Sequence, residues 1–110
     1  MAKFVFQGSF RGETIAGMID HPSDRVAAVS KAMATVGGTL DQYYWVLGEY
    51  DFLAIVEVSN SFSAAAVSLA ISSTGVFTHT ETHELIPAGE LASVLERAKS
   101  VRAAYQPPGA

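Results

Sequence analysis

Hydrophobic residues form three continuous runs along this chain instead of alternating with polar residues. The runs cover residues 4–6, 43–47 and 52–56. Because successive side chains of a strand point to opposite faces of a sheet, a strand with one face in water alternates apolar and polar residues. The runs therefore predict strands that are covered on both faces. A chain of 110 residues has enough helix to cover one face of a sheet, so we expect a second copy of the chain to cover the other.

The pattern between these runs predicts the remaining elements. Strands are expected at residues 3–9, 39–47, 51–58 and 76–85, a short helix at 13–20, and longer helices at about 21–36, at 62–74 and from Pro87 onward. Pro22 suits the first turn of the first long helix, and Ser23 or Asp24 suits its N-terminus. The connection at 48–50 is short enough to join antiparallel neighbours, so the strands beside it form a hairpin.

Together these elements follow the order β-α-β-β-α-β with an appended C-terminal helix. This order predicts an α+β fold with a ferredoxin-like, four-stranded antiparallel sheet. Right-handed crossovers place both long helices on one face of that sheet. We expect a single domain over residues 1–110, ending in an extended tail from about residue 103 to 110. The bare face of the sheet favours a homodimer or a higher homo-oligomer.

Composition narrows the expected partners and location. Charged residues make up 16% of the chain, and the net charge is −4 without a run of basic residues. Nucleic acid and membranes attract clustered positive charge, so neither is an expected partner. The absence of cysteine excludes disulfides and thiolate chemistry. The sequence shows no signal-peptide core and no apolar stretch near the ~18 residues that span a membrane, so we expect a cytoplasmic protein.

The hairpin turn carries the most recognisable motif. Gly48-Glu49-Tyr50-Asp51 fits a Gly-x-Tyr-Asp pattern, and through it the chain resembles the GYD-domain family. Other matching pieces are residues 6–9, Arg25, Gly37-Gly38, Gly75 and residues 85–87. The resemblance covers nearly the whole chain and implies a dimeric α+β barrel, in which two ferredoxin-like units press their sheets together. Similar barrels include muconolactone isomerase-like enzymes, cofactor-independent monooxygenases and haem proteins, so the fold alone assigns no function.

The fourth predicted strand contains a cluster with site-like spacing. His79, Glu81 and His83 alternate along it, so they share one face of the sheet at about 7 Å intervals. These side chains could divide acid and base roles, or His79 and His83 could hold a divalent metal. Alternatively, they form the polar face of an edge strand. The two histidines lie outside the GYD pattern, so a chemical role would be specific to this chain.

The hairpin motif adds further candidates. Tyr50 and Asp51 could join the catalytic chemistry of the strand cluster. For Asp51 the pattern favours a structural role, in which it accepts hydrogen bonds from backbone N–H groups at the turn; the alternative is that it pairs with Arg25 or a ligand. Arg25 itself fits either a surface ion pair or a clamp for an anion.

Three consecutive aromatic residues place rings on both faces of the predicted sheet. Tyr43, Tyr44 and Trp45 could pack in the core or in a dimer interface. They could also line a cavity for a flat organic ligand. We therefore take Tyr44 and Trp45, together with Arg25, as the candidate ligand-binding residues.

These observations favour a protein that binds a small apolar or aromatic molecule, in a cleft between sheet and helices or between subunits. It could be an enzyme that needs no organic cofactor, with His79, Glu81, His83, Tyr50 and Asp51 as catalytic candidates. One alternative is a non-catalytic assembly module. Another is a metal-binding protein that uses His79, Glu81 and His83.

Overall fold

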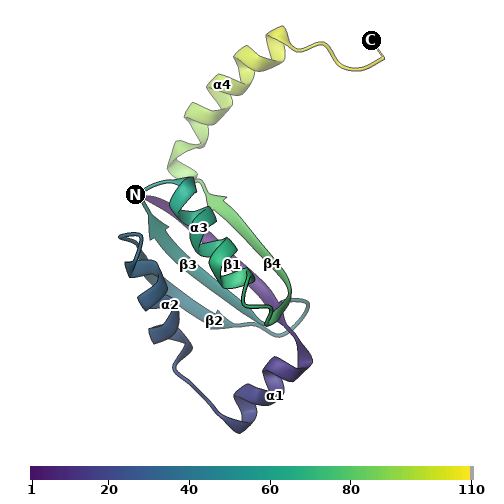
Figure 1. Cartoon of the computed structure of the whole chain (residues 1–110). Helices are drawn as coiled ribbons and strands as arrows, with labels where there is room; N and C mark the ends of the chain where they lie inside the picture. Colours follow the sequence, from purple (N-terminus) through teal and green to yellow (C-terminus); the bar gives the residue numbers. More distant parts are fainter. Residues whose placement is uncertain (110) are drawn as a thin grey trace.

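A computed structural model describes residues 1–109 of the chain (Figure 1). Its strands are β1 (Ala2–Phe10), β2 (Thr39–Trp45), β3 (Phe52–Val58) and β4 (Phe77–Leu85). Its helices are α1 (Gly12–Asp20), α2 (Arg25–Ala34), α3 (Ser61–Ser72) and α4 (Leu91–Ala104), with a short 3-10 turn, η1 (Ala88–Glu90), before α4. This order confirms the predicted α+β, ferredoxin-like arrangement with its appended helix.

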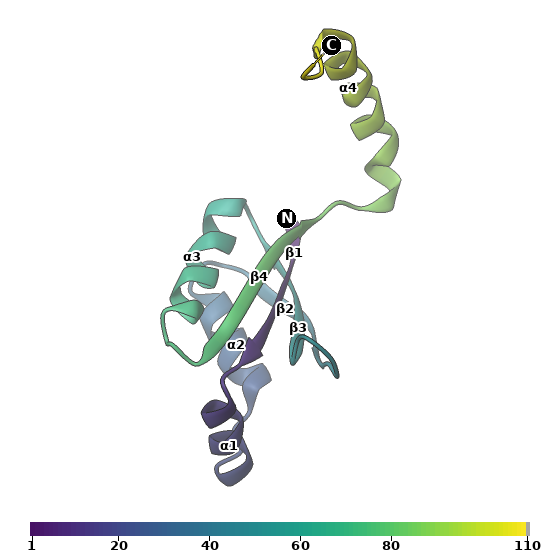
Figure 2. The same cartoon turned by 90° about the vertical axis from the view of Figure 1, so that its right-hand side faces the viewer.

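The four strands form one antiparallel sheet in the order β2-β3-β1-β4. In the register of this sheet, Val5 of β1 lies between Ile55 of β3 and His83 of β4. Figure 2 shows α2 and α3 together on one side of the sheet. The turn end of the β2–β3 hairpin curves away from these helices, toward the other side. The predicted placement of both helices on one face is therefore confirmed.

Several element boundaries differ from those expected; β2, for example, ends at Trp45 rather than at residue 47. The prediction that Pro22 occupies the first turn of α2 is wrong, because the helix begins at Arg25, where the Asp24 carboxylate accepts a hydrogen bond from the Ala27 amide at 3.0 Å. Helix α4 continues to Ala104, so the tail begins at Tyr105 rather than at residue 103. The predicted end of that tail, Ala110, lies outside the described residues.

The buried core lies between the sheet and the two helices. It consists of alternate residues of β1 and β3 together with residues of α2 and α3: Phe4, Phe6, Phe10, Met33, Phe52, Ala54, Val56, Val58, Ala64 and Val67. The helix side therefore takes the phenylalanines of the apolar runs. The intervening aliphatic residues, Val5, Leu53 and Ile55, lie on the open face. Val5 pairs with Ile55 across β1 and β3, and Leu53 lies beside Ile55 on β3. The apolar runs of the sequence thus place phenylalanines on the face that the helices cover and an aliphatic strip on the open face.

Candidate functional site

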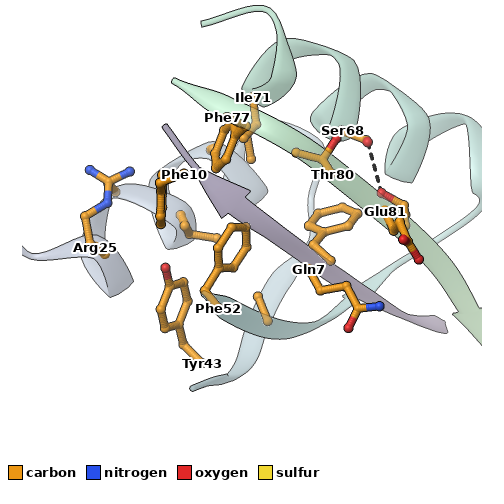
Figure 3. A pocket seen from close by; sticks show the side chains of 16 residues that line it. Gln7, Phe10, Arg25, Tyr43, Phe52, Ser68, Ile71, Phe77, Thr80 and Glu81 are labelled. Atoms are coloured by element: carbon orange, nitrogen blue, oxygen red, sulfur yellow. Dashed lines mark hydrogen bonds between the residues drawn. The ribbon is translucent and has the colours of Figure 1, made fainter. Parts of the chain in front are cut away.

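A cavity of about 100 Å³ lies between the sheet and the two covering helices. Its lining combines aromatic rings from all four strands with aliphatic side chains from α2 and α3 (Figure 3). The rings are those of Phe6, Phe10, Tyr43, Phe52 and Phe77, and the helices contribute Val29 and Ile71 among others. Because the cavity sits where the sheet and helices meet, the fold itself forms the space, without a partner subunit.

The rings around this cavity contact one another in a continuous group. Phe10 stacks on Phe77 with centroids 4.9 Å apart, and its ring lies 5.4 Å from that of Phe52. Phe52 in turn stacks on Tyr43 at 5.8 Å, with only 9° between the ring planes. Aromatic pairs at such separations are mutually stabilising. The cavity therefore has flat, apolar walls that are well suited to the face of another ring.

Arg25 stands at one end of the cavity lining, on the first turn of α2 (Figure 3). Its side chain is half-buried, and within residues 1–109 its guanidinium has neither a hydrogen-bond acceptor nor an ion-pair partner. Burial raises the pKa of the neighbouring Tyr43 hydroxyl, and the positive charge of Arg25 acts in the opposite direction. The cavity thus ends at a cation that is available to an anionic group.

Hydroxyl pairs close the β4 side of the cavity. Thr80 bonds to Ser72 at 3.0 Å, and Thr82 donates to Ser68 at 2.9 Å. These bonds fix α3 to β4 and satisfy hydroxyl groups that would otherwise be exposed to an apolar space. The serine-rich sequence of α3 therefore holds the helix against the edge strand.

A second group of chemically active side chains lies on the open face of the sheet. The Tyr50 hydroxyl donates to Oε2 of Glu81. The Nε2 atom of His79 lies 2.8 Å from the same oxygen, and Nε2 of His83 lies 2.9 Å from Oε1. Tyr50 and His79 also approach each other, with ring centroids 6.2 Å apart. The structure thus brings four of the predicted catalytic candidates into one network around a carboxylate.

The electrostatics of this network keep Glu81 ionised. Hydrogen bonds from Tyr50, His79 and His83 lower the pKa of Glu81 to about 2. The hydrogen bond to Glu81 raises the pKa of the Tyr50 hydroxyl to about 12, with a smaller contribution from burial. A carboxylate can only accept hydrogen bonds, so both imidazoles donate through Nε2–H. Proton exchange with another molecule would therefore occur at the Nδ1 atoms of the two histidines.

The arrangement of donors around Glu81 also bears on metal binding. Among residues 1–109, no group of three or more His, Cys, Asp or Glu side chains is arranged to hold a metal ion. Both Nε2 atoms point at the carboxylate that separates them, instead of converging with it on a common point.

The sheet separates this network from the cavity. Glu81 pairs with Gln7 in the register, and although both residues belong to the cavity lining, alternation along β4 places Glu81 on the face opposite Thr80 and Thr82. Figure 3 shows both side chains turned away from the rings. A ligand inside the cavity therefore meets Arg25 and the aromatic walls, whereas His79, Glu81 and His83 face whatever covers the open side.

Asp51 holds the hairpin turn to the first strand. Its Oδ2 accepts a hydrogen bond from the Phe10 amide at 2.8 Å, and its own amide donates to the Gly8 carbonyl at 2.8 Å. The Phe10 amide lies where the register of β1 and β4 shifts. Gly48 starts the turn with φ 138°, a conformation that favours glycine. These contacts give Gly48 and Asp51 of the motif a structural task.

Tyr44 and Trp45, predicted as walls of a ligand site, lie outside the cavity lining. Tyr44 pairs with Leu53 on the open face, while Trp45 is largely exposed and touches Tyr43 edge-on with centroids 5.4 Å apart. Sequence reasoning did not single out Phe10, Phe52 and Phe77 as cavity residues. Their signal is the alternation of Phe4, Phe6 and Phe10, which continues one residue beyond the predicted end of the strand.

A ferredoxin-like sheet with two helices and a cavity beneath them defines the structural class of this chain. The chain belongs to the GYD domain family, whose model matches residues 4–95. The solved structure of TTHA0845 from Thermus thermophilus is similar, with a TM-score of 0.52 at 25% identity over 80% of this chain and 96% of that one. Protein Atu4242 from Agrobacterium tumefaciens has a TM-score of 0.50 at 14% identity, over 80% and 94% of the two chains.

No curated protein sequence matches this chain. Among the residues that the structure describes, no helix combines the length and the apolar character needed to span a membrane.

Proposed function

We propose that this protein binds a small, single-ring aromatic molecule carrying an anionic group, in the cavity between the sheet and α2 and α3. The aromatic lining of that cavity is the observation that carries the proposal. A volume of about 100 Å³ is of the same order as the ~150 Å³ apolar cavity that accepts benzene in an engineered protein. The guanidinium of Arg25 lies at one end of the lining without an acceptor among residues 1–109, and it favours a carboxylate or a similar substituent on the ring.

Calorimetric titration with benzoate and with benzyl alcohol tests this proposal. Both probes carry one ring, but only benzoate has a charge that Arg25 can pair with. We expect benzoate to bind with a Kd of about 1 mM or tighter, given the usual energy per atom of small ligands. Benzyl alcohol should bind more weakly because it lacks the ionic contact.

Variants of α2 locate the binding. Ala32→Leu fills part of the lining and should weaken both probes at least tenfold, whereas Ala34→Leu, on an exposed position of the same helix, should leave them unchanged. Arg25→Gln should weaken benzoate by about tenfold and spare benzyl alcohol, with the exposed Lys31→Gln as its control. Equal effects of each variant and its control would contradict the proposal.

We also infer that the working form is a homodimer in which two open sheet faces pack together. Val5, Leu53 and Ile55 support this inference, because they form an aliphatic strip on a face that no helix of the chain covers in Figure 2. Sedimentation of Ile55→Lys should show a monomer at concentrations where the parent chain is dimeric. Ser30→Lys, on the exposed side of α2, should remain dimeric. A parent chain that is monomeric at micromolar concentration would refute the dimer and would leave the cavity proposal standing.

A further inference from the structure

Helix α4 leaves the body of the molecule. Figures 1 and 2 show it projecting from the end of β4, and Figure 2 shows it on the side of the open sheet face. Every residue from Leu91 to Ala104 is exposed. An isolated helix of 14 residues is only marginally stable in water, so α4 needs a surface to pack against.

One side of α4 is suited to such a surface. Its apolar residues gather on this side and form a stripe that Arg102 shares: Leu91, Val94, Leu95, Ala98, Val101 and, just beyond the helix, Tyr105. Most of these side chains are more than half exposed, including Leu95 at 58% and Val101 at 65%. The stripe is therefore an unpartnered docking face.

The charges of α4 indicate the character of its partner. Residues 91–104 contain three basic residues and one acidic residue, a net charge of +2. The rest of the chain contains four basic and ten acidic residues, a net charge of −6, and the two values sum to −4. The helix is thus a cationic element attached to an anionic body, which favours docking on a second copy of that body.

Helix α1 presents the matching surface at the opposite end of the molecule (Figure 1). Its inner side is held to the body, since Met18 packs on the core and the Thr14 hydroxyl donates to the Val76 carbonyl. Its outer side exposes Ile15 and Ile19, the latter at 74%. Glu13 and Asp20, both acidic, lie beyond this apolar strip on the side of α1 away from Met18, and Glu13 pairs with Arg11 at 3.1 Å.

Symmetry brings the two helices together. Consider a second copy that is placed against the open face and rotated by half a turn about an axis perpendicular to the view of Figure 2. Its α1 then lies at the end where α4 of the first copy projects. A helix of 14 residues is about 21 Å long, enough to pass a facing sheet that packs about 10 Å away. The same operation places α4 of the second copy against α1 of the first.

We propose that α4 clasps a second copy of the chain by packing its apolar stripe on the outer face of that copy's α1. Arg102 then lies near the carboxylates of Glu13 and Asp20, and Arg97 and Lys99 border the contact on its two sides. The contact occurs twice in each dimer and encloses the paired sheets at both ends. This proposal rests on the face-to-face dimer proposed above, and it assigns α1 and α4 a function in assembly that is separate from ligand binding.

Disulfide cross-linking tests the contact directly, because the chain has no cysteine of its own. Ala16→Cys on α1 and Ala98→Cys on α4, co-expressed as separate chains, should yield a cross-linked dimer on mild oxidation. Ala16→Cys paired with Ser100→Cys, on the opposite side of α4, is the matched control and should yield at least fivefold less. Each single variant alone should remain uncross-linked, since equivalent positions lie at opposite ends of the dimer.

Charge reversal gives an independent readout. Replacing Arg97, Lys99 and Arg102 by glutamate should raise the Kd of the dimer at least tenfold, and adding Glu13→Lys with Asp20→Lys should restore most of the loss. A stable dimer with equal cross-linking in test and control pairs would overturn the clasp and leave the sheet interface standing. Cross-linked ladders longer than two chains, or binding of α4 to anionic vesicles in place of α1, would also overturn it. A monomer in sedimentation would refute the dimer itself.

Discussion

At the scale of single residues, Asp51 shows how a short motif can serve the fold. Its carboxylate satisfies the Phe10 amide at the point where the β1–β4 register shifts, and its amide bonds to Gly8. Both bonds tie the hairpin turn to the strand that carries Phe10 into the cavity lining. The motif therefore supports the candidate ligand site from a distance.

Removal of that carboxylate should destabilise the chain. Asp51→Ala leaves the partly buried Phe10 amide without an acceptor, which costs about 1–3 kcal/mol. Chemical denaturation at neutral pH measures the loss. Glu49→Ala, at an exposed neighbour in the same turn, should change stability by less than about 0.5 kcal/mol, and equal losses in the two variants would contradict the assigned role of Asp51.

The network around Glu81 predicts a pH dependence of stability. The folded-state pKa of Glu81 is about 2, below its usual value of 4.5, so the unfolded chain takes up the proton first as the pH falls. The stabilisation is therefore complete above pH 4.5 and is lost progressively as the pH falls towards 2. The difference in unfolding free energy between the parent chain and Glu81→Gln should narrow over that interval, while Glu96→Gln on α4 shows no such trend. A difference that stays constant with pH would contradict this account.

Tyr50 belongs to the same network and titrates at the other end of the scale. Its pKa is raised from 10 to about 12, so its contribution is complete below pH 10 and disappears as the pH rises towards 12. Spectrophotometric titration of the tyrosines should therefore lose its highest-pH transition in Tyr50→Phe, but retain it in Tyr105→Phe. Loss of a transition near pH 10 in Tyr50→Phe, with the highest-pH transition retained, would show that this hydroxyl does not bond to Glu81.

The candidate residues differ in how far the sequence could predict their positions. Alternation along one strand was enough to place His79, Glu81 and His83 on a common face. The hydrogen bond between Tyr50 and Glu81 could not be predicted from the sequence, because it joins residues that are 31 positions apart. The strand register that brings them together is set by tertiary contacts. Tyr44 and Trp45 show the same limit, since the face that each ring occupies depends on the register of β2 with β3.

At the scale of elements, short-range signals predicted the order and approximate bounds of the strands and helices. The glycine pair at 37–38 correctly marks the passage from α2 to β2. A Cβ atom at Gly38 would lie 2.7 Å from both the Glu57 carbonyl oxygen and Cγ1 of Val58, so this position needs glycine for close approach, whereas Gly37, with φ 70°, makes the turn. The extent of α4 was harder to bound, because its last turn has no glycine stop.

Gly38→Ala should therefore destabilise the chain by about 1–3 kcal/mol, since the strand backbone and Met33 must shift to admit the methyl group. Gly17→Ala is the matched change inside α1, where a Cβ atom meets nothing within 4 Å. That variant should gain about 0.5–1 kcal/mol of stability from helix propensity. Thermal and chemical denaturation measure both changes, and a neutral Gly38→Ala would contradict the packing described at this crossing.

At the scale of the whole molecule, one sheet separates two kinds of chemistry. Aromatic rings and Arg25 meet on the helix side, whereas Glu81 and its hydrogen-bonding partners lie on the open side with the aliphatic strip. The continuous apolar runs of the sequence predicted that both faces would matter, but they did not reveal that the phenylalanines gather on one of them. That division follows from alternation combined with register, and it is what separates ligand binding from assembly in our proposals.

The binding of a ring in the sheet–helix cavity is the central claim, and nuclear magnetic resonance of the ¹⁵N-labelled chain tests it most directly. During titration with benzoate, the amide signals of Phe10, Ala28 and Phe77 should shift and saturate together with one Kd. The amides of Val5, His83 and Leu53 on the open face should change far less. Saturating shifts confined to the open face, or no saturable shift at millimolar benzoate, would contradict the claim.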